Sequence, residues 1–259
     1  MNTALKATIS DPAPSGQVRK FSDIFPDLKS ECMKIMQASK WYGLEKLEPE
    51  MVRLWIPQFS LWTRSTFKLR GLAYAHCPHP DLRLTLLDII GEEDVIDPRV
   101  GMNHRQLFAS TLANASGQSM EELADARPLP TTLVTFNILH GAANRTWEEG
   151  IALSSGLERM LQECGYFRYD AMRLQRDLGW SESDIGWFTG HDAADVEHGS
   201  VMDKLDKYVT DDRTWDRVRD TVIECWIAWW ILFDGIVDAH RYGIKPVSGL
   251  TCKTLSTVF

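Results

Sequence analysis

The stretch HDAADVEHG, residues 191–199, carries the spacing His-x3-Asp-x2-His. A helix turns by about 100° per residue, so offsets of four and seven residues return to nearly the same azimuth. His191, Asp195 and His198 are therefore predicted to lie within about 60° of one another on one face of a helix. Two imidazoles and a carboxylate form a mixed nitrogen and oxygen donor set, which suits a borderline metal such as iron.

Helical spacing of apolar residues extends outward from this stretch in both directions. No stretch shows the alternating apolar and polar residues of a strand bounded by turns. We therefore predict an all-α fold, a bundle of about seven or eight helices around one core. The segments with helical patterns, some of them short, cover residues 27–39, 48–74, 81–93, 103 onward, 119–126, 131–153, 157–164, 168–178, 181–208 and 211–240.

Length and composition suit one large domain. The chain has 259 residues, of which 44% are hydrophobic, and it contains ten Trp and ten Phe. This apolar content is enough for a substantial core. Residues 1–20 are rich in Ser, Pro, Gly and Ala, so we expect a flexible N-terminal arm there. Residues 21–259 are predicted to form a single helical domain.

Charge and cysteine content exclude several classes of protein. The net charge is −8 and the Lys and Arg residues are scattered, which argues against a nucleic-acid partner. Five cysteines without a Cys-x2-Cys pair argue against a disulfide framework and a structural zinc site. The N-terminus has no apolar signal region, and the longest apolar run, residues 225–233, is too short to span a bilayer. We expect a cytoplasmic protein with no membrane partner.

Other segments supply further metal-binding side chains. An oxygen-activating di-iron centre in a helical bundle needs carboxylates from facing helices as well as a His-rich face. The alternative is that such residues lie on solvated helix faces and bind no metal. The further candidate ligands lie on three other segments: Glu92 and Glu93, His104, and Glu148 and Glu149.

In this combination the chain resembles a known family, the haem-oxygenase-like di-iron oxidases and oxygenases. That family has a Glu near the end of one helix, a His at the start of the next, a Glu after an aromatic residue on a later helix, and then His-x3-Asp-x2-His. Residues 86–93 (LLDIIGEE), 103–108 (NHRQLF) and 142–148 (AANRTWE) match the first three elements, and the resemblance spans about residues 50–240. It implies six catalytic metal ligands: Glu93, His104, Glu148, His191, Asp195 and His198.

Two connections are longer here than is common in the family. One joins Glu93 to His104, and the other joins Glu148 to His191. The extra length means that neighbouring carboxylates can replace the first two glutamates. The alternatives left open are Glu92, Asp94 or Asp97 in place of Glu93, and Glu149 in place of Glu148.

The resemblance implies an enzyme that uses two Fe(II) ions as cofactor and O2 as co-substrate. The expected substrate is a small amine- or amino-acid-like metabolite of specialised biosynthesis. The expected reaction is N-oxygenation, oxidative C–C cleavage, desaturation or nitrile formation. A homodimer and an external electron donor are left open as partners. The alternatives are a metal-independent enzyme of the same fold, resembling thiaminase-like or pyrroloquinoline-quinone-synthase-like enzymes, and a non-enzymatic helical binding protein.

Three residues near Glu148 are candidates for substrate binding. Gly141 and Asn144 precede Glu148 by seven and four residues and so share its helical face. Gly141 would leave room for a substrate, Asn144 would hydrogen-bond it, and Arg145 would pair with a substrate carboxylate. The alternatives are close helix packing at Gly141 and solvent exposure of Arg145.

Two glycines, Gly190 and Gly199, flank the His-x3-Asp-x2-His motif. Each lowers helical preference by about 1 kcal/mol relative to Ala. In the family that the chain resembles, the helix with this motif is often mobile and the second iron is held weakly. We therefore expect the isolated protein to have empty or partly filled metal sites, and two irons per chain without added iron would contradict this.

Overall fold

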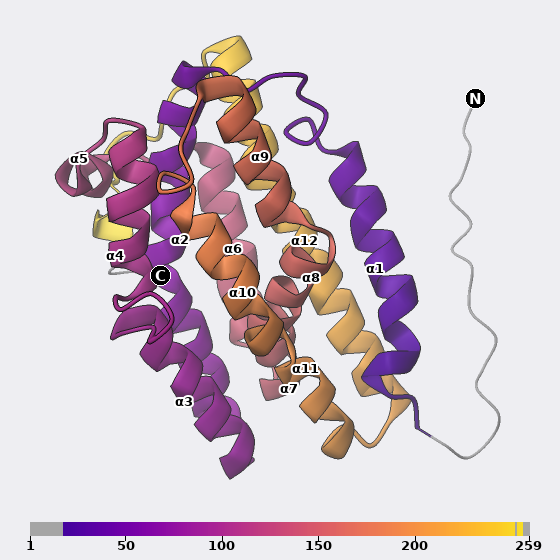
Figure 1. Ribbon diagram of the computed structural model, residues 1–259. Coiled ribbons are helices and arrows are strands. Elements are labelled where there is room, and N and C mark those ends of the chain that lie inside the picture. Colours follow the sequence, from indigo (N-terminus) through magenta and orange to yellow (C-terminus); the bar gives the residue numbers. More distant parts are fainter. Residues whose placement is uncertain (1–17, 252, 256–259) are drawn as a thin grey trace, which may run out of the picture.

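The structure is a computed structural model that describes residues 18–251 and 253–255 of the 259-residue chain (Figure 1). The predicted flexible arm, residues 1–20, lies outside the described residues except at its end. There Arg19 donates hydrogen bonds to the main chain of Asp212 and to the carboxylate of Asp216, the latter at 2.6 Å. Arg19, at the end of the predicted arm, thus contacts the start of α12.

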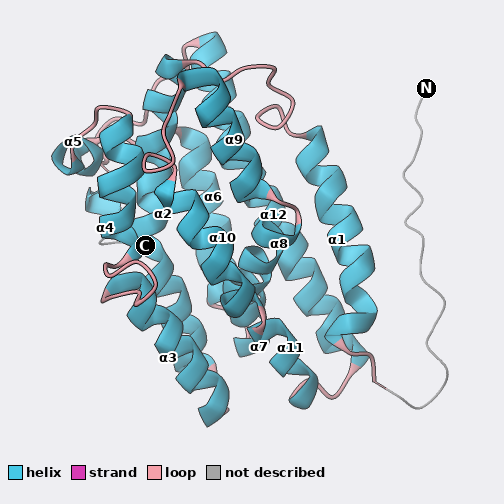
Figure 2. Cartoon of the chain, in the orientation of Figure 1, coloured by secondary structure: helices cyan, strands magenta, loops and turns pink. Residues whose placement is uncertain are grey.

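All regular structure in the described part of the chain is helical, so the all-α prediction is confirmed (Figure 2). An isolated bridge between Asp97 and Met102 is the only β-type pairing among these residues. The α-helices are α1 (Phe21–Ala38), α2 (Pro49–His76), α3 (Pro80–Asp94), α4 (His104–Phe108), α5 (Met120–Asp125), α6 (Pro130–Ala143), α7 (Trp147–Ile151), α8 (Leu157–Glu163), α9 (Tyr166–Leu178), α10 (Gly186–Gly199), α11 (Val201–Lys204) and α12 (Asp212–Tyr242).

The described chain has more helices than predicted because several predicted helices are divided. The π-helical segment η1 (Ala109–Ala113) extends α4, η2 (Ala152–Gly156) joins α7 to α8, and the 3-10 helix η3 (Leu205–Lys207) follows α11. The predicted continuous helix over residues 131–153 is wrong. Asn144 turns its side chain back onto the carbonyl of residue 140, at 2.8 Å, and Thr146 then caps a new helix. Side chains that bond to nearby main chain in this way compete with helix continuation.

The two long helices, α2 and α12, support the rest of the bundle. α12 packs along α6, α1 and α2, while α10 packs against α8, α9 and α4. Figure 1 shows α1 and α3 on opposite flanks, with α10 between them. The motif of residues 191–199 therefore lies on a central helix, close to the ends of α3 and α4.

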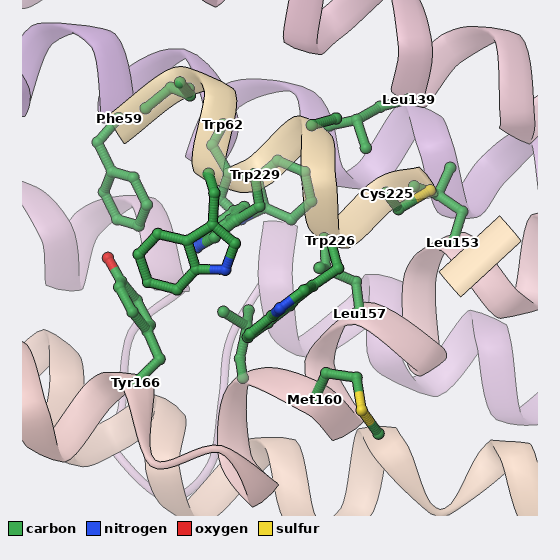
Figure 3. Close-up of a cluster of buried hydrophobic side chains, with 14 of the residues drawn as sticks. Phe59, Trp62, Leu139, Leu153, Leu157, Met160, Tyr166, Cys225, Trp226 and Trp229 are labelled. Carbon is green, nitrogen blue, oxygen red and sulfur yellow. The ribbon is translucent and has the colours of Figure 1, made fainter. Parts of the chain in front are cut away.

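The core between α2 and α12 is rich in aromatic side chains, and Figure 3 shows Phe59, Trp62 and Trp229 in one buried cluster. Trp229 of α12 meets Phe59 and Trp62 of α2 edge to face, with centroids 5.7 and 5.0 Å apart. Trp187 of α10 packs edge to face on Phe59 at 5.0 Å and lies against the ring of His191 at 3.8 Å. This packing fixes α10 to α2 and sets the position of the first histidine of the motif.

Candidate metal centre

The motif of α10 faces the interior of the bundle. His191, Asp195 and His198 are 6%, 0% and 1% exposed, although two are ionisable imidazoles and one is a carboxylate. Asp192 and Glu197 of the same helix are more exposed. The three donors thus lie together on the buried face of α10. The other polar residues of the helix, Asp192 and Glu197, lie away from that face.

Glu93 and His104 come from the junction between α3 and α4. Glu93 lies in the last turn of α3 and is 7% exposed, and His104 is the first residue of α4 and is 2% exposed. Asn103 caps α4 by accepting a hydrogen bond from the main chain of Gln106, at 2.8 Å. Because this cap fixes where α4 begins, it also fixes His104, whose Nδ1 lies 2.9 Å from Oε1 of Glu93.

The third buried carboxylate of the cluster belongs to Glu158 of α8, which sequence reasoning missed. Glu158 is 5% exposed, and its Oε2 lies 3.6 Å from Nδ1 of His198. Ten residues earlier, the predicted ligand Glu148 is half-buried at the start of α7, near Cys77. The break before Thr146 and the π-helical segment η2 set the direction of α8, which turns Glu158 toward α10.

Glu149, the alternative to Glu148, is also outside the cluster. It is buried, but Thr146 and Thr221 hydrogen-bond its carboxylate, and Arg145 lies 3.6 Å away. One feature of the sequence pointed to the error in assigning Glu148. The stretch from Glu148 to His191 is longer than is common in the family, and Glu158 shortens it by ten residues.

The buried donors form two groups that have Glu93 in common. The first is Glu93, His104 and His191, and the second is Glu93, Glu158 and His198, with the donor atoms of each group within 4.8 Å of one another. Asp195 adjoins the second group, since its Oδ1 lies 3.8 Å from Nδ1 of His198. The structure therefore brings together five of the six predicted ligands, and Glu158 occupies the place in the cluster that was predicted for Glu148.

One nitrogen of the His191 ring is held by the backbone. Nδ1 lies 2.9 Å from the carbonyl oxygen of Trp187, one turn earlier in α10. A carbonyl only accepts, so Nδ1 carries the hydrogen and Nε2 is left as a metal-binding nitrogen. Burial, together with the nearby ring of His104, holds the pKa of His191 well below its usual range, which keeps the ring neutral.

The other two histidines are held by carboxylates behind them. Nε2 of His104 lies 2.9 Å from Oδ2 of Asp97, and Nε2 of His198 lies 2.8 Å from Oε2 of Glu92. Arg99 donates hydrogen bonds to both carboxylates, to Asp97 at 2.9 Å and to Glu92. Asp97 and Glu92, which were considered as alternatives to Glu93, thus orient His104 and His198. The third, Asp94, is exposed.

Several donor atoms of the cluster make no well-aligned hydrogen bond. These buried atoms are Nδ1 of His104, which lies 2.9 Å from Glu93 but outside hydrogen-bond geometry, Nδ1 of His198, both carboxylate oxygens of Asp195 and Oε2 of Glu158. Leaving a buried polar atom unpaired costs about 1–3 kcal/mol. Binding of metal ions would satisfy all of these atoms at once. The residues present therefore fit a metal centre.

Burial and neighbouring charges shift the pKa values of Asp195, Glu93 and His198. Burial, with repulsion from Glu158, raises the pKa of Asp195 well above its usual range. Burial alone would also raise the pKa of Glu93, but Arg70 and His104 outweigh it and hold that pKa well below the ordinary value. Burial would lower the pKa of His198, but the carboxylates of Glu158 and Glu92 raise it to about 10.

A small cavity of about 10 Å³ adjoins the cluster. Its non-ligand walls are Trp62, Thr63, Thr66, Leu161, Phe167, Trp187 and Trp229. The predicted substrate residues Gly141, Asn144 and Arg145 do not line it, because all three are exposed at the end of α6. Arg145 instead forms two hydrogen bonds with Glu224, at 2.7 and 2.9 Å.

Nucleophilic thiols are not part of this site. The four cysteines that the structure describes, Cys32, Cys77, Cys164 and Cys225, are all buried, and none lines the cavity. Burial raises the pKa of each of these thiols, so none is a ready thiolate.

Fold and site together define an all-α bundle with a buried His and carboxylate centre suited to metal. The chain belongs to the iron-containing redox enzyme family, whose model matches residues 53–230. The resemblance to haem-oxygenase-like proteins is thereby confirmed. No curated protein matches the chain. Within the described residues, no helix combines the length and apolar character that crossing a membrane requires.

Solved structures share the fold at low sequence identity. A domain of unknown function with a heme oxygenase-like fold from Shewanella denitrificans has a TM-score of 0.74 at 15% identity, and the match covers 90% of this chain and 98% of that one. A CADD-like protein of unknown function from Nostoc punctiforme has a TM-score of 0.67 at 12% identity, covering 87% and 99%. A TenA homologue from Pseudomonas syringae has a TM-score of 0.61 at 15% identity, covering 84% and 90%.

Proposed function

We propose that this chain is an O2-dependent, non-haem di-iron oxidoreductase that acts on a small amine- or amino-acid-like metabolite in specialised biosynthesis. The observation that carries the proposal is the pair of donor groups that share Glu93. A carboxylate common to two groups, each completed by histidine, is the arrangement that two neighbouring metal ions need. Membership of an iron-containing redox family supports iron as the metal.

In this proposal, the protein holds two ions through side chains of α3, α4, α8 and α10. Two ferrous ions, when bound, would provide the electrons that reduce O2 and the oxidising power toward the substrate. The three histidines bind as neutral ligands, and Asp97, Glu92 and a backbone carbonyl keep their rings oriented. The six proposed ligands are Glu93, His104, Glu158, His191, Asp195 and His198.

The cavity beside the cluster supports a small, amine-bearing substrate. Trp62, Trp187 and Trp229 surround it and exclude water from the reacting groups. Indole faces attract cations such as a substrate ammonium group. Thr63 and Thr66 add neutral hydroxyls for orientation. Among the described residues, every anionic group that lines this cavity belongs to the proposed ligand set, so the indole side chains are the other groups available to a substrate ammonium group.

The size of the cavity adds a requirement. A volume of about 10 Å³ holds roughly one water molecule. Substrate binding must therefore displace the surrounding side chains, which favours a small metabolite. Whether the outcome is N-oxygenation, oxidative C–C cleavage, desaturation or nitrile formation depends on which substrate atom then lies nearest the centre.

The test is an anaerobic titration of the purified protein with Fe(II), followed by mixing with O2 and stopped-flow absorbance. We expect two irons per chain and an iron-dependent transient absorbance that decays faster when an amine or amino acid that is a substrate is present. The variants His191→Ala and His198→Ala should lose iron and the transient. Absence of both bound iron and transient in the unsubstituted protein would contradict the proposal and favour a metal-independent enzyme or a binding protein.

A further inference from the structure

A buried arginine lies among the carboxylates of the centre. Arg70 of α2 is 2% exposed and is the one cation besides histidine that contacts them in the described chain. Its Nη2 donates a hydrogen bond to Oε1 of Glu158. Its Nη1 lies 3.5 Å from Oε1 of Glu93. The guanidinium therefore contacts two of the proposed metal ligands.

The guanidinium is held by fewer hydrogen bonds than it can make. Nη1 and Nε of Arg70 are buried without a hydrogen-bond partner. Arg173 of α9, also 2% exposed, likewise has two buried nitrogens without a partner, Nε and Nη2, and its Nη1 donates to Asp170 at 3.2 Å and to the carbonyl of Trp41 at 3.1 Å. The difference lies in the groups that are contacted: Arg70 contacts Glu158 and Glu93 of the centre, so an ion bound at the centre competes for the same carboxylates.

The two donor groups are affected unequally by Arg70. In the group of Glu93, Glu158 and His198, the guanidinium contacts both carboxylates. In the group of Glu93, His104 and His191, it approaches only Glu93, and both histidines are free of it. An ion at the Glu158 group must bind a carboxylate that the guanidinium already holds through Oε1, and it then lies close to that positive charge.

We propose that Arg70 is an internal cation that competes with the metal ion of the Glu158 group, so that the two metal positions load in sequence. This inference rests on the proposed function, because it requires a two-metal centre. In the metal-free protein, Arg70 neutralises part of the carboxylate charge. Once an ion fills the Glu158 group, the same arginine becomes a repulsive neighbour and weakens binding there.

The test is a titration with Mn(II), in which electron paramagnetic resonance counts the unbound ion and no turnover is needed. In the unsubstituted protein we expect two binding steps, the second at least about tenfold weaker. Arg70→Met should strengthen the second step at least about tenfold and change the first step less. A tenfold change in affinity corresponds to about 1.4 kcal/mol.

Arg173→Met is the matched control, because it removes an equally buried arginine that contacts none of the proposed ligands. It should lower thermal stability and leave both Mn(II) steps unchanged. If Arg70→Met does not fold, Arg70→Gln keeps a hydrogen-bond donor near Glu158 without the charge, and the same strengthening is expected. An unchanged or weaker second step in the folded variant would overturn the inference. Absence of any Mn(II) or Fe(II) binding in the unsubstituted protein would instead overturn the proposed function.

Discussion

At the scale of single residues, Glu158 and Glu148 offer a direct test of the third carboxylate. Glu158 is buried beside His198, whereas Glu148 is half-buried at the start of α7. Glu158→Ala should weaken metal binding by more than about 100-fold, the upper range for residues that only orient a ligand. Glu148→Ala should leave metal content unchanged. Equal metal content in both variants, measured by iron analysis after gel filtration, would contradict the assignment of Glu158.

The protonation of His198 predicts a pH dependence of metal binding. Its pKa is raised to about 10 in the metal-free protein, so the ring is protonated at neutral pH. The stability that this charge contributes is present below about 6.5, the ordinary pKa of histidine, and is lost as pH rises through the raised value. A metal ion at Nδ1 must displace this proton.

Metal binding should therefore release a proton, and the affinity of the Glu158 group should rise up to about tenfold per pH unit between pH 6.5 and 8.5. Proton release measured in weakly buffered solution during Mn(II) titration checks this. His191 acts as the internal comparison, because its pKa lies well below the ordinary value and its metal-binding nitrogen, Nε2, has no proton to lose. Affinity that is flat over this range would show that His198 is already neutral.

The sequence predicted the positions of the candidate site residues best where helical spacing alone determines them. His191, Asp195 and His198 follow from helical periodicity, and all three are buried on one face. Glu158 could not be found in this way, because its direction depends on the break before Thr146 and on the π-helical segment η2. The interior position of Arg70 was missed for a different reason, because a lone arginine in a long helix usually faces solvent.

At the scale of elements, the contact between α8 and α10 depends on Gly199. A Cβ atom there would lie 3.0 Å from Cα and Cβ of Arg159, which a flexible side chain cannot relieve. Gly199→Ala should therefore push α10 away from α8 and destabilise the fold by about 1–3 kcal/mol. Because Glu158 and His198 are the adjacent residues on these two helices, the Glu158 group should also lose metal affinity.

Gly141→Ala is the matched control for this substitution. Gly141 lies in α6, is exposed, and a Cβ atom there would meet nothing within 4 Å. Replacing this exposed helical glycine by alanine should raise stability by up to about 1 kcal/mol. Urea unfolding of both variants checks the pair. A Gly199→Ala variant as stable as the unsubstituted protein would show that the two helices can separate without cost.

The boundaries of the helices show where element-scale prediction succeeds. Predicted helices 48–74 and 81–93 closely match α2 and α3, because Pro49 and Pro80 begin them and apolar spacing continues throughout. The prediction failed over residues 131–153, where the side chains of Asn144 and Thr146 hydrogen-bond to the main chain and end one helix before the next begins. Such local bonds leave little trace in apolar periodicity.

At the scale of the whole molecule, the helical bundle could be predicted because the residues of its core and its candidate site are spread over many helices. An error in one helix therefore leaves the predicted fold unchanged. The apolar content predicted a substantial core, and large aromatic side chains of α2 and α12, among them Phe59, Trp62, Trp226 and Trp229, are buried in it (Figure 3). The surroundings of the predicted substrate residues were not predictable. Gly141 and Asn144 were expected to share a helical face with Glu148, but the helix is broken between them and Glu148, and both residues, like Arg145, are exposed.

Loading the centre should stabilise the whole fold. The metal-free interior contains three buried carboxylates, two of which, Glu158 and Asp195, have oxygen atoms without a hydrogen-bond partner, and one arginine lies among them. A ligand that binds only the folded state at 100 times its dissociation constant adds about 2.7 kcal/mol. For a chain of this size, that corresponds to a rise in Tm of roughly 5–10 °C.

Anaerobic thermal unfolding with and without Fe(II), followed by circular dichroism, measures this rise. A chelator should reverse it, and the His191→Ala and His198→Ala variants should show little or none of it. Because both donor groups share Glu93, one bound ion should give part of the rise and the second ion the remainder. A Tm that does not respond to Fe(II) would mean that the buried carboxylates are satisfied without metal, and the two-metal centre would then have no physical basis in this fold.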